Sequence, residues 1–414
     1  LGGSTADRIG RRRVFQTGLV VFTLGSLLCG LAPGLGWLIA FRVLQAVGGS
    51  MLNPVAMSII TNTFTDPRER ARAIGVWGGA IGISMALGPV LGGGLIDSAS
   101  WRAIFFINVP VGLGAIVFSA LLVPESRAPR PRRLDPIGQL LILVLLAALI
   151  YAIIEGPGAG WRAPEIVGLF ALAGAALAGL LWYESRRVEP LLDLKFFRSM
   201  PFSGATLIAV CGFAALAGFQ FLNTLYLQEV RGFSALRAGL YTLPMAGMTV
   251  VFAPLSGRLV GARGARLPLL VAGTALTAGA ILLTGLTPST STPRLLVAYL
   301  VFGLGFGTLN APITNTAVSG MPVAQAGVAA AIASTSRQVG QSLGVAVVGS
   351  AVASGLAGTG FTAASRIGWW IVTGCGALVL LLGILSTSRW ASRTAAAVRE
   401  RDGAEAVTMG LGTR

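Results

Sequence analysis

Residues 3–33 read GSTADRIGRRRVFQTGLVVFTLGSLLCGLAP, a short arginine-rich segment followed by a long apolar run. A helix needs about 20 apolar residues to cross the hydrocarbon core of a bilayer, and residues 14–33 supply them. The same alternation of a cationic connector with an apolar run recurs along the whole chain. This stretch therefore predicts an all-α protein that crosses the membrane many times.

Twelve apolar runs are long enough to span a bilayer. They are continuous rather than alternating, which favours helices over the strands of a membrane barrel. The composition agrees, because 54% of the residues are apolar and 11% are charged, whereas a soluble domain carries about 25% charged residues. These values exclude a soluble domain, a disordered chain and a disulfide scaffold. The predicted spans are 14–33, 36–60, 73–95, 101–123, 136–154, 165–183, 203–228, 237–257, 267–286, 294–317, 325–352 and 366–387.

The connectors between these spans alternate in charge. One side carries 23 of the 31 Lys and Arg residues, the opposite side carries six, and Arg42 and Arg337 lie inside spans. By the positive-inside rule the first side is cytoplasmic, so both visible termini of this multi-pass protein are expected on the cytoplasmic face of the plasma membrane. The net charge of +16 is thus read mainly as topology, and nucleic acid is not expected as a partner.

Catalytic and metal-binding groups are scarce. The chain has no His, which removes the imidazole base and the commonest metal ligand. Cys29, Cys211 and Cys375 stand apart in apolar runs and lack the spacing of metal ligands. No paired carboxylates and no nucleophile–base set are visible. We therefore expect no metal site, no cofactor and no enzyme.

An internal repeat divides the chain. Residues 257–266, GRLVGARGAR, resemble residues 3–13 in placing two glycines seven positions apart among arginines. A similar offset of 254–258 residues relates 49–54 to 307–312, and the glycine-rich run around Gly88 to the one around Gly344. Internal repeats build the two halves of many transporters.

The position of the repeat predicts the domain organisation. The second copy follows two spans and precedes four, whereas the first copy precedes four spans and follows none. Symmetry predicts two six-helix halves with an extra helix pair between them, fourteen spans in the parent and twelve visible. A complete twelve-span protein is the alternative, and it leaves the repeat out of phase. The predicted parts are an N-terminal half lacking its first two helices (1–123), a linker with the extra pair (124–202), a C-terminal six-helix half (203–387) and a cytoplasmic tail (388–414).

Four motifs stand out: Gly3-x-x-Ala6-Asp7-Arg8-x-Gly10-Arg11-Arg12; Arg42-x-x-Gln45-Ala46-x-Gly48; Gly88-Pro89-x-x-Gly92-Gly93, followed by Trp101-Arg102 and Phe105-Phe106-x-Asn108-x-Pro110; and Arg337-Gln338-x-Gly340-x-x-x-Gly344. They resemble motifs of the major facilitator superfamily, and specifically of its fourteen-span drug:proton antiporters, over nearly the whole chain. Thr5 departs from the first motif, where the family usually has Leu. The resemblance implies alternating access driven by the proton gradient.

The resemblance also implies a gating loop on the cytoplasmic side, formed by Gly3, Asp7, Arg8, Gly10 and Arg11. Glycines 3 and 10 permit a tight turn and close approach of helices. Asp7 can accept charge-assisted bonds from arginines or from a helix N-terminus. An ordinary positive-inside connector accounts for the arginines alone, whereas an Asp framed by two glycines favours a latch.

Arg42 and Gln45 are predicted to take part in proton coupling. A guanidinium at the centre of a span costs about 2.5–3.5 kcal/mol on insertion scales. Gln45 lies on the same helix face at i+3 and can satisfy part of that charge. Snorkelling to the interface is the alternative, since Arg42 lies near one end of its span. The proton-coupling role itself is implied by the resemblance.

Gly88, Pro89, Gly92 and Gly93 are predicted to form a kinked, closely packed helix face. Proline removes one helical hydrogen bond, and small residues let a second helix approach. Generic glycine-rich packing is the alternative. The resemblance implies that this motif distinguishes antiporters from symporters.

Polar side chains inside the later spans are cavity candidates. Arg337 shares a helix face with Ser334 and Gln341, and a lipid-facing arginine would be costly there. Phe219, Phe221 and Phe306 offer aromatic surface to organic cations, although plain packing is the more common role of a membrane Phe. The predicted cavity or substrate residues are Asn53, Gln220, Asn223, Asn310, Thr314, Arg337, Gln338 and Gln341.

Together these features predict an exporter of small amphipathic organic compounds, such as drugs and antibiotics, in exchange for protons. The alternatives are an exporter of one metabolite (an antibiotic, a siderophore or an amino acid) and a membrane sensor without transport. No carboxylate lies at mid-span, because Asp97, Glu155 and Glu229 fall at predicted outer ends. Either one of these three acids reaches inward, or the coupling carboxylate lies upstream of Leu1.

Overall fold

The computed structural model describes residues 2–64, 66–127, 135–187, 194–319, 321, 326–359 and 361–408. Every regular element in these ranges is a helix, as expected for the fold class. The α-helices are α1 (Gly2–Ile9), α2 (Arg11–Leu31), α3 (Leu35–Thr63), α4 (Pro67–Ser98), α5 (Ala103–Phe106), α6 (Asn108–Leu122), α7 (Pro136–Ala159), α8 (Pro164–Glu184), α9 (Met200–Leu225), α10 (Ala235–Tyr241), α11 (Leu243–Arg263), α12 (Arg266–Leu283), α13 (Thr292–Gly307), α14 (Asn310–Ser319), α15 (Ala326–Thr359), α16 (Phe361–Ser386) and α17 (Arg389–Thr408). A 3₁₀ turn, η1 (Leu194–Arg198), and a π turn, η2 (Tyr226–Val230), complete them.

Ten helical segments of the described chain are long and apolar enough to cross a membrane. The other two predicted spans, 73–95 and 325–352, coincide with α4 and α15. The chain is thus a multi-pass helical membrane protein. Helices α7 and α8 correspond to the predicted spans 136–154 and 165–183. That they form an extra pair between two six-helix halves stays a prediction.

Two predicted spans are interrupted, each two or more residues before a proline. Span 101–123 is divided into α5 and α6, and span 294–317 into α13 and α14. Each second piece begins Asn-x-Pro, with Pro110 and Pro312. A proline cannot donate to the carbonyl four residues back. In the second case that carbonyl belongs to Thr308, and the Ser256 hydroxyl of α11 donates to it at 2.9 Å.

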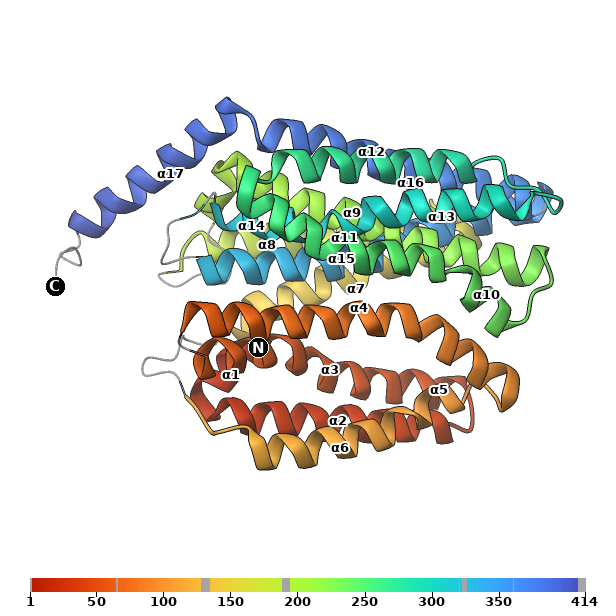
Figure 1. Cartoon of the computed structure of the whole chain (residues 1–414), viewed down its shortest axis with the longest axis horizontal. Coiled ribbons are helices and arrows are strands. Elements are labelled where there is room, and N and C mark those ends of the chain that lie inside the picture. The colour runs from red at the N-terminus through yellow and green to blue at the C-terminus, as the bar shows by residue number, and fades with distance from the viewer. Residues whose placement is uncertain are drawn as a thin grey trace. The chain divides into compact units, whose positions relative to one another are not determined.

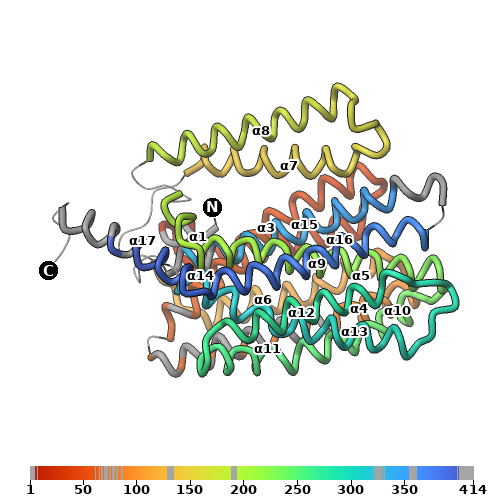
Figure 2. Tube along the Cα trace, turned by 90° about the horizontal axis from the view of Figure 1, so that it is seen from above, coloured from red at the N-terminus to blue at the C-terminus, as the bar shows by residue number. Residues whose placement is uncertain are grey.

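The chain divides into two compact units, residues 1–139 with 234–240, and residues 140–233 with 241–414. In the first unit α2 packs against α3 on one side and against α5 and α6 on another, as Figure 1 shows. In the second unit α9 contacts α14, α15 and α16, and the tubes of α15 and α16 run along α9 in Figure 2. The predicted boundaries at 123, 202 and 387 stay predictions.

The two arginine-rich copies of the repeat have related backbones. Gly10 separates α1 from α2 with a φ of 128°, and Gly264 separates α11 from α12 with a φ of 81°. Positive φ is readily adopted only by glycine. The 254-residue offset of the sequence repeat therefore corresponds to two equivalent helix–turn–helix connections. Gly3 differs from the expectation, because it lies inside α1 and takes no part in the turn.

Candidate functional site

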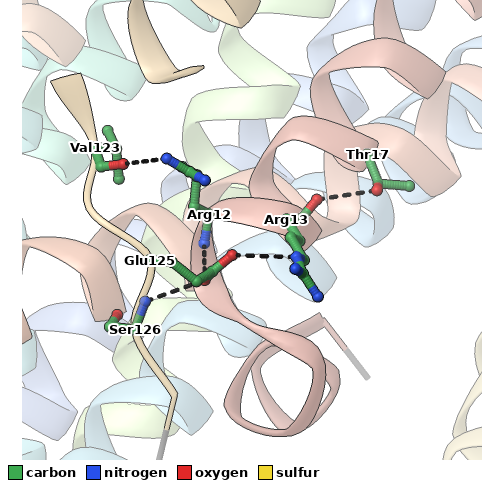
Figure 3. A network of polar contacts seen from close by, with 6 residues as sticks. All are labelled: Arg12, Arg13, Thr17, Val123, Glu125 and Ser126. Carbon is green, nitrogen blue, oxygen red and sulfur yellow. Dashed lines mark hydrogen bonds and ion pairs between the residues drawn. The ribbon is translucent and has the colours of Figure 1, made fainter. Parts of the chain in front are cut away.

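The arginine-rich connector is held by the segment that follows α6 (Figure 3). The amide of Arg12 donates to Glu125 Oε1 at 3.1 Å, and Arg13 Nε lies 3.7 Å from Glu125 Oε2. The Arg12 guanidinium donates to the Val123 carbonyl at 3.3 Å, and the Arg11 amide donates to the Ser126 carbonyl at 2.9 Å. One carboxylate thus ties the start of α2 to the end of α6.

Gly10 makes room for this carboxylate. A Cβ on Gly10 would come within 2.6 Å of Glu125 Oε1, well inside any ordinary contact. Gly10 is therefore required by its positive φ, and a side chain there would also displace the flexible carboxylate of Glu125. Arg8 is exposed and Arg11 is buried. The side chain of Asp7 lies outside the described part, so its predicted role as a latch stays a prediction.

Arg42 and Gln45 are brought together as their spacing predicts. Arg42 Nη1 donates to Gln45 Oε1 at 2.8 Å, and the guanidinium carbon lies 5.7 Å from the centre of the Phe105 ring. Gln45 is buried, and its backbone lies against Gly25 of α2, where a Cβ would meet Gln45 Cα at 2.7 Å. The packing of α2 on α3 therefore fixes the acceptor that orients Arg42.

The motif after α4 anchors α5 and α6 to α2. Asn108 Nδ2 donates to Ser26 Oγ, and Ser26 Oγ donates to the Phe105 carbonyl, both at 3.0 Å. Arg102 donates to the Ala32 carbonyl at 3.1 Å. These bonds position the Phe105 ring beneath Arg42.

The glycine–proline motif of α4 meets α10, which belongs to the same unit. A Cβ on Gly93 would lie 2.7 Å from Leu236 Cα and would overlap the Ala235 carbonyl. A Cβ on Gly239 would lie 2.7 Å from the Pro89 carbonyl carbon. Gly88 and Gly92 face open space. The close approach predicted for the motif thus depends on Gly93 and on Gly239 of its partner.

Asp97 extends this contact at the end of α4. Its Oδ1 accepts from the Ala235 amide at 3.1 Å, and its Oδ2 accepts from the Leu236 amide at 2.9 Å. The Ser234 side chain, followed by these amides, lowers the pKa of Asp97 below its ordinary value, because hydrogen bonds favour the ionised carboxylate. Asp97 is therefore an acceptor for the N-terminus of α10, beyond the end of its predicted span.

Among the C-terminal candidates, Arg337 and Thr314 form a pair. Arg337 Nη2 donates to Thr314 Oγ1 at 2.6 Å, and its guanidinium carbon lies 5.9 Å from the centre of the Phe213 ring. Phe213 in turn packs edge-to-face on Phe306, with ring centres 5.2 Å apart. This group comes from α9, α13, α14 and α15 of one unit.

Asn223 has a different environment. It is 1% exposed, and its amide oxygen accepts the Tyr299 hydroxyl. Phe219 stacks on Phe302 with ring centres 4.4 Å apart and also contacts Tyr299. This surrounding favours a packing role for Asn223 and Phe219 over cavity lining. The remaining cavity candidates are exposed (Asn53, Gln220, Gln338) or half-buried (Asn310, Gln341).

The three acids at the predicted outer ends of the spans do not reach the middle of a span. Glu155 and Glu229 are exposed, and Asp97 is committed to α10. Within the described ranges no group of three or more acids or cysteines forms a metal site.

Three residues of these contacts were not predicted. Glu125 could have been found as the acid that precedes the arginines of connector 124–135. Asp97 stood out only as an outer acid, and its partner α10 is 138 residues away in sequence. Tyr299 is a tyrosine within an apolar run, and nothing in the sequence indicated which group its hydroxyl would contact.

Comparison with known proteins identifies the family of the chain. The Major Facilitator Superfamily description matches residues 1–345. The multidrug resistance protein Stp of Mycobacterium tuberculosis is 37% identical over 354 residues, which cover 86% of this chain and 66% of that protein. The tetracenomycin C resistance and export protein of Streptomyces glaucescens is 37% identical, covering 85% of this chain and 65% of that protein. The chain spans just under two thirds of the length of these relatives.

A solved structure of a POT family transporter in complex with 5-aminolevulinic acid superposes with a TM-score of 0.67, covering 94% of this chain and 84% of that chain. At 15% identity this likeness shows a shared fold and nothing of the cargo. The family match and the two relatives carry the assignment further. The chain belongs to the Major Facilitator Superfamily, and it is similar to proteins named for multidrug resistance and for antibiotic resistance and export.

Proposed function

We propose that the protein exports small amphipathic organic compounds in exchange for protons. The observation that supports the proposal is the direct backbone contact that Gly93 makes with α10, because alternating access requires closely packed helices that slide past one another or separate. The relatives, one named for multidrug resistance and one for antibiotic resistance and export, support the same class of cargo.

In this proposal Arg42 and Gln45 form the proton-coupling element of the first unit. The Arg42 guanidinium is held within a span by two contacts: Nη1 lies 2.8 Å from Gln45 Oε1, and the guanidinium carbon lies 5.7 Å from the centre of the Phe105 ring. Such a charge raises the cost of protonating a carboxylate that approaches it and lowers that cost when the carboxylate leaves. The Gly10–Glu125 connection serves as the cytoplasmic latch, with both termini on that side.

Transport in proteoliposomes tests the proposal. The full-length protein is reconstituted, an inward proton gradient is imposed, and efflux of ethidium is followed by fluorescence, with an ionophore that collapses the gradient as control. We expect efflux that requires the gradient and that Arg42→Ala abolishes at unchanged protein levels. Efflux that persists without a gradient would disprove antiport, and wild-type rates in Arg42→Ala would remove Arg42 from coupling.

A narrower cargo is the second candidate, because one relative is named for a single antibiotic. Growth protection against a panel of unrelated dyes and drugs separates the two. Protection against several unrelated compounds supports multidrug export, whereas protection against one compound, with secretion of that metabolite, supports the narrow cargo. A sensor without transport predicts no flux under any gradient.

A further inference from the structure

Arg337 carries a charge that the surrounding protein satisfies incompletely. Within the described chain its guanidinium donates to the neutral hydroxyl of Thr314, at 2.6 Å. Its Nε is buried and has no hydrogen-bond acceptor there. No carboxylate of the described residues forms an ion pair with it. A guanidinium with an unsatisfied buried N–H, enclosed among helices, is an expensive arrangement.

The arginine is also held in place. Gly340 and Gly344, which follow Arg337 on α15, bring this helix against the backbone of α9. A Cβ on Gly340 would lie 2.9 Å from Val210 Cα, and a Cβ on Gly344 would lie 2.6 Å from Ala214 Cα. The guanidinium therefore cannot relax outward by moving its helix. Its position differs from that of Arg42, which is exposed and bonded to an amide oxygen.

The wall beside the guanidinium is aromatic. The Phe213 ring lies 5.9 Å from the guanidinium carbon and is supported by Phe306. Thr314 Oγ1 lies 3.5 Å from the Asn310 carbonyl, at the limit of a hydrogen bond, so its proton is available to another acceptor. A cation, a hydroxyl donor and a ring face thus converge at one place.

We infer that Arg337, Thr314 and Phe213 form a subsite for the oxyanion of an aromatic organic acid, so that carboxylates and phenolates belong to the cargo. The inference rests on the proposed export function and names a substrate class for it. A planar carboxylate fits the N–H fork of arginine in a way that an ammonium or amide does not. Aromatic cations, which Phe213 alone would attract, are disfavoured next to this charge.

Three probes with one ring system and three charges test the inference: naphthoate, naphthamide and naphthylmethylammonium. Their binding to the full-length protein in lipid nanodiscs is measured by equilibrium dialysis, with protein integrity checked by gel filtration. We expect wild-type protein to prefer naphthoate. Arg337→Gln should weaken naphthoate by about 10- to 100-fold, the loss typical of hydrogen bonds to charged groups, and should leave naphthamide unchanged.

Arg366→Gln is the matched control, because it removes the same charge from an exposed position near the start of α16; it should change none of the three affinities. Arg337→Lys keeps the charge without the fork and should lose part of the preference. Thr314→Val should weaken naphthoate less than Arg337→Gln does. These two variants decide the matter if Arg337→Gln fails to fold, and an unchanged preference for naphthoate in both would overturn the inference.

Inorganic anions and ethidium efflux separate the remaining outcomes. If phosphate or chloride displaces naphthoate at equal concentration, the subsite holds a small inorganic anion and the inference is wrong. Equal binding of naphthoate and naphthamide to wild-type protein also overturns it. Ethidium efflux is measured in the same preparation: efflux without acid recognition leaves the exporter proposal standing and removes only this subsite, whereas no gradient-driven flux of any probe removes the exporter proposal itself.

Discussion

Replacing Gly93 by Ala should weaken the contact between α4 and α10. The added Cβ would lie 2.6 Å from the Ala235 carbonyl carbon and 2.7 Å from Leu236 Cα, and ordinary contact begins at 3.4 Å. The two backbones must therefore separate by about 0.8 Å, because the obstructing atoms are backbone and cannot rotate away. Forcing an extra methyl into a well-packed contact costs about 1–3 kcal/mol.

That cost falls only on the state in which the helices touch. A penalty of about 1–3 kcal/mol shifts the equilibrium between touching and separated helices by about 5- to 150-fold. The amides of Ala235 and Leu236, which donate to Asp97, would spend more time without an acceptor. Their hydrogen exchange should accelerate by a similar factor, and transport should slow if the touching state belongs to the cycle.

Hydrogen–deuterium exchange of a peptide covering residues 234–240 measures the effect, with turnover followed in proteoliposomes. Gly94→Ala is the matched control, because its Cβ would meet only Leu236 Cδ1 at an ordinary 3.8 Å. Both substitutions improve intrinsic helix propensity equally. Wild-type exchange in Gly93→Ala, or the same acceleration in Gly94→Ala, would refute the reasoning that backbone contact at Gly93 holds α10.

Three further predictions follow from single contacts. Asp97 stabilises the α10 contact while it is ionised; since its pKa is lowered, this contribution is complete above the ordinary carboxyl pKa and is lost as the pH falls through the lowered value. Hydrogen exchange of residues 234–240, corrected for intrinsic rates, should therefore rise at acid pH in wild-type protein but not in Asp97→Asn. Equal pH profiles in the two proteins would count against a stabilising role of the Asp97 carboxylate. Glu125→Gln should accelerate exchange of the Arg12 amide by roughly two- to fivefold, since it weakens an exposed ion pair and a charged acceptor worth about 0.5–1 kcal/mol; no change would show that Glu125 does not hold the connector. Gln45→Leu should lower gradient-driven efflux more than Gln45→Glu, because Arg42 loses its acceptor at 2.8 Å, and identical rates in both variants would separate Gln45 from coupling.

Local features of the sequence predicted the positions of most helices. Apolar length located the spans, since each needs about 20 residues, and the i+3 spacing of Arg42 and Gln45 predicted their bond. The sequence repeat aligned Gly10 with Gly264, and both of these glycines have a positive φ. These features depend on neighbours along one helix or one connector, which a single sequence displays.

Contacts between distant segments were not predictable in the same way. Nothing local connects Glu125 to Gly10, or Asp97 to the amides of α10, because the partners are more than 100 residues apart. Asn223 shows that the role of a polar residue within a span is equally hard to predict. A polar residue in a span must be satisfied, and the sequence does not reveal whether the partner is a cargo, water or the Tyr299 hydroxyl.

The repeat itself shows why sequence similarity does not determine helix continuity. Pro54 and Pro312 occupy equivalent positions in residues 49–54 and 307–312. Helix α3 continues through Pro54 from Leu35 to Thr63, whereas the helix before Pro312 ends at Gly307. Each proline frees a carbonyl four residues earlier, and for Pro312 the hydroxyl of Ser256 on α11 bonds that carbonyl at 2.9 Å. A donor from another helix satisfies a carbonyl that has lost its helical hydrogen bond, and this makes an interruption of the helix less costly. Whether the helix is interrupted therefore depends on the neighbouring helix as well as on the proline.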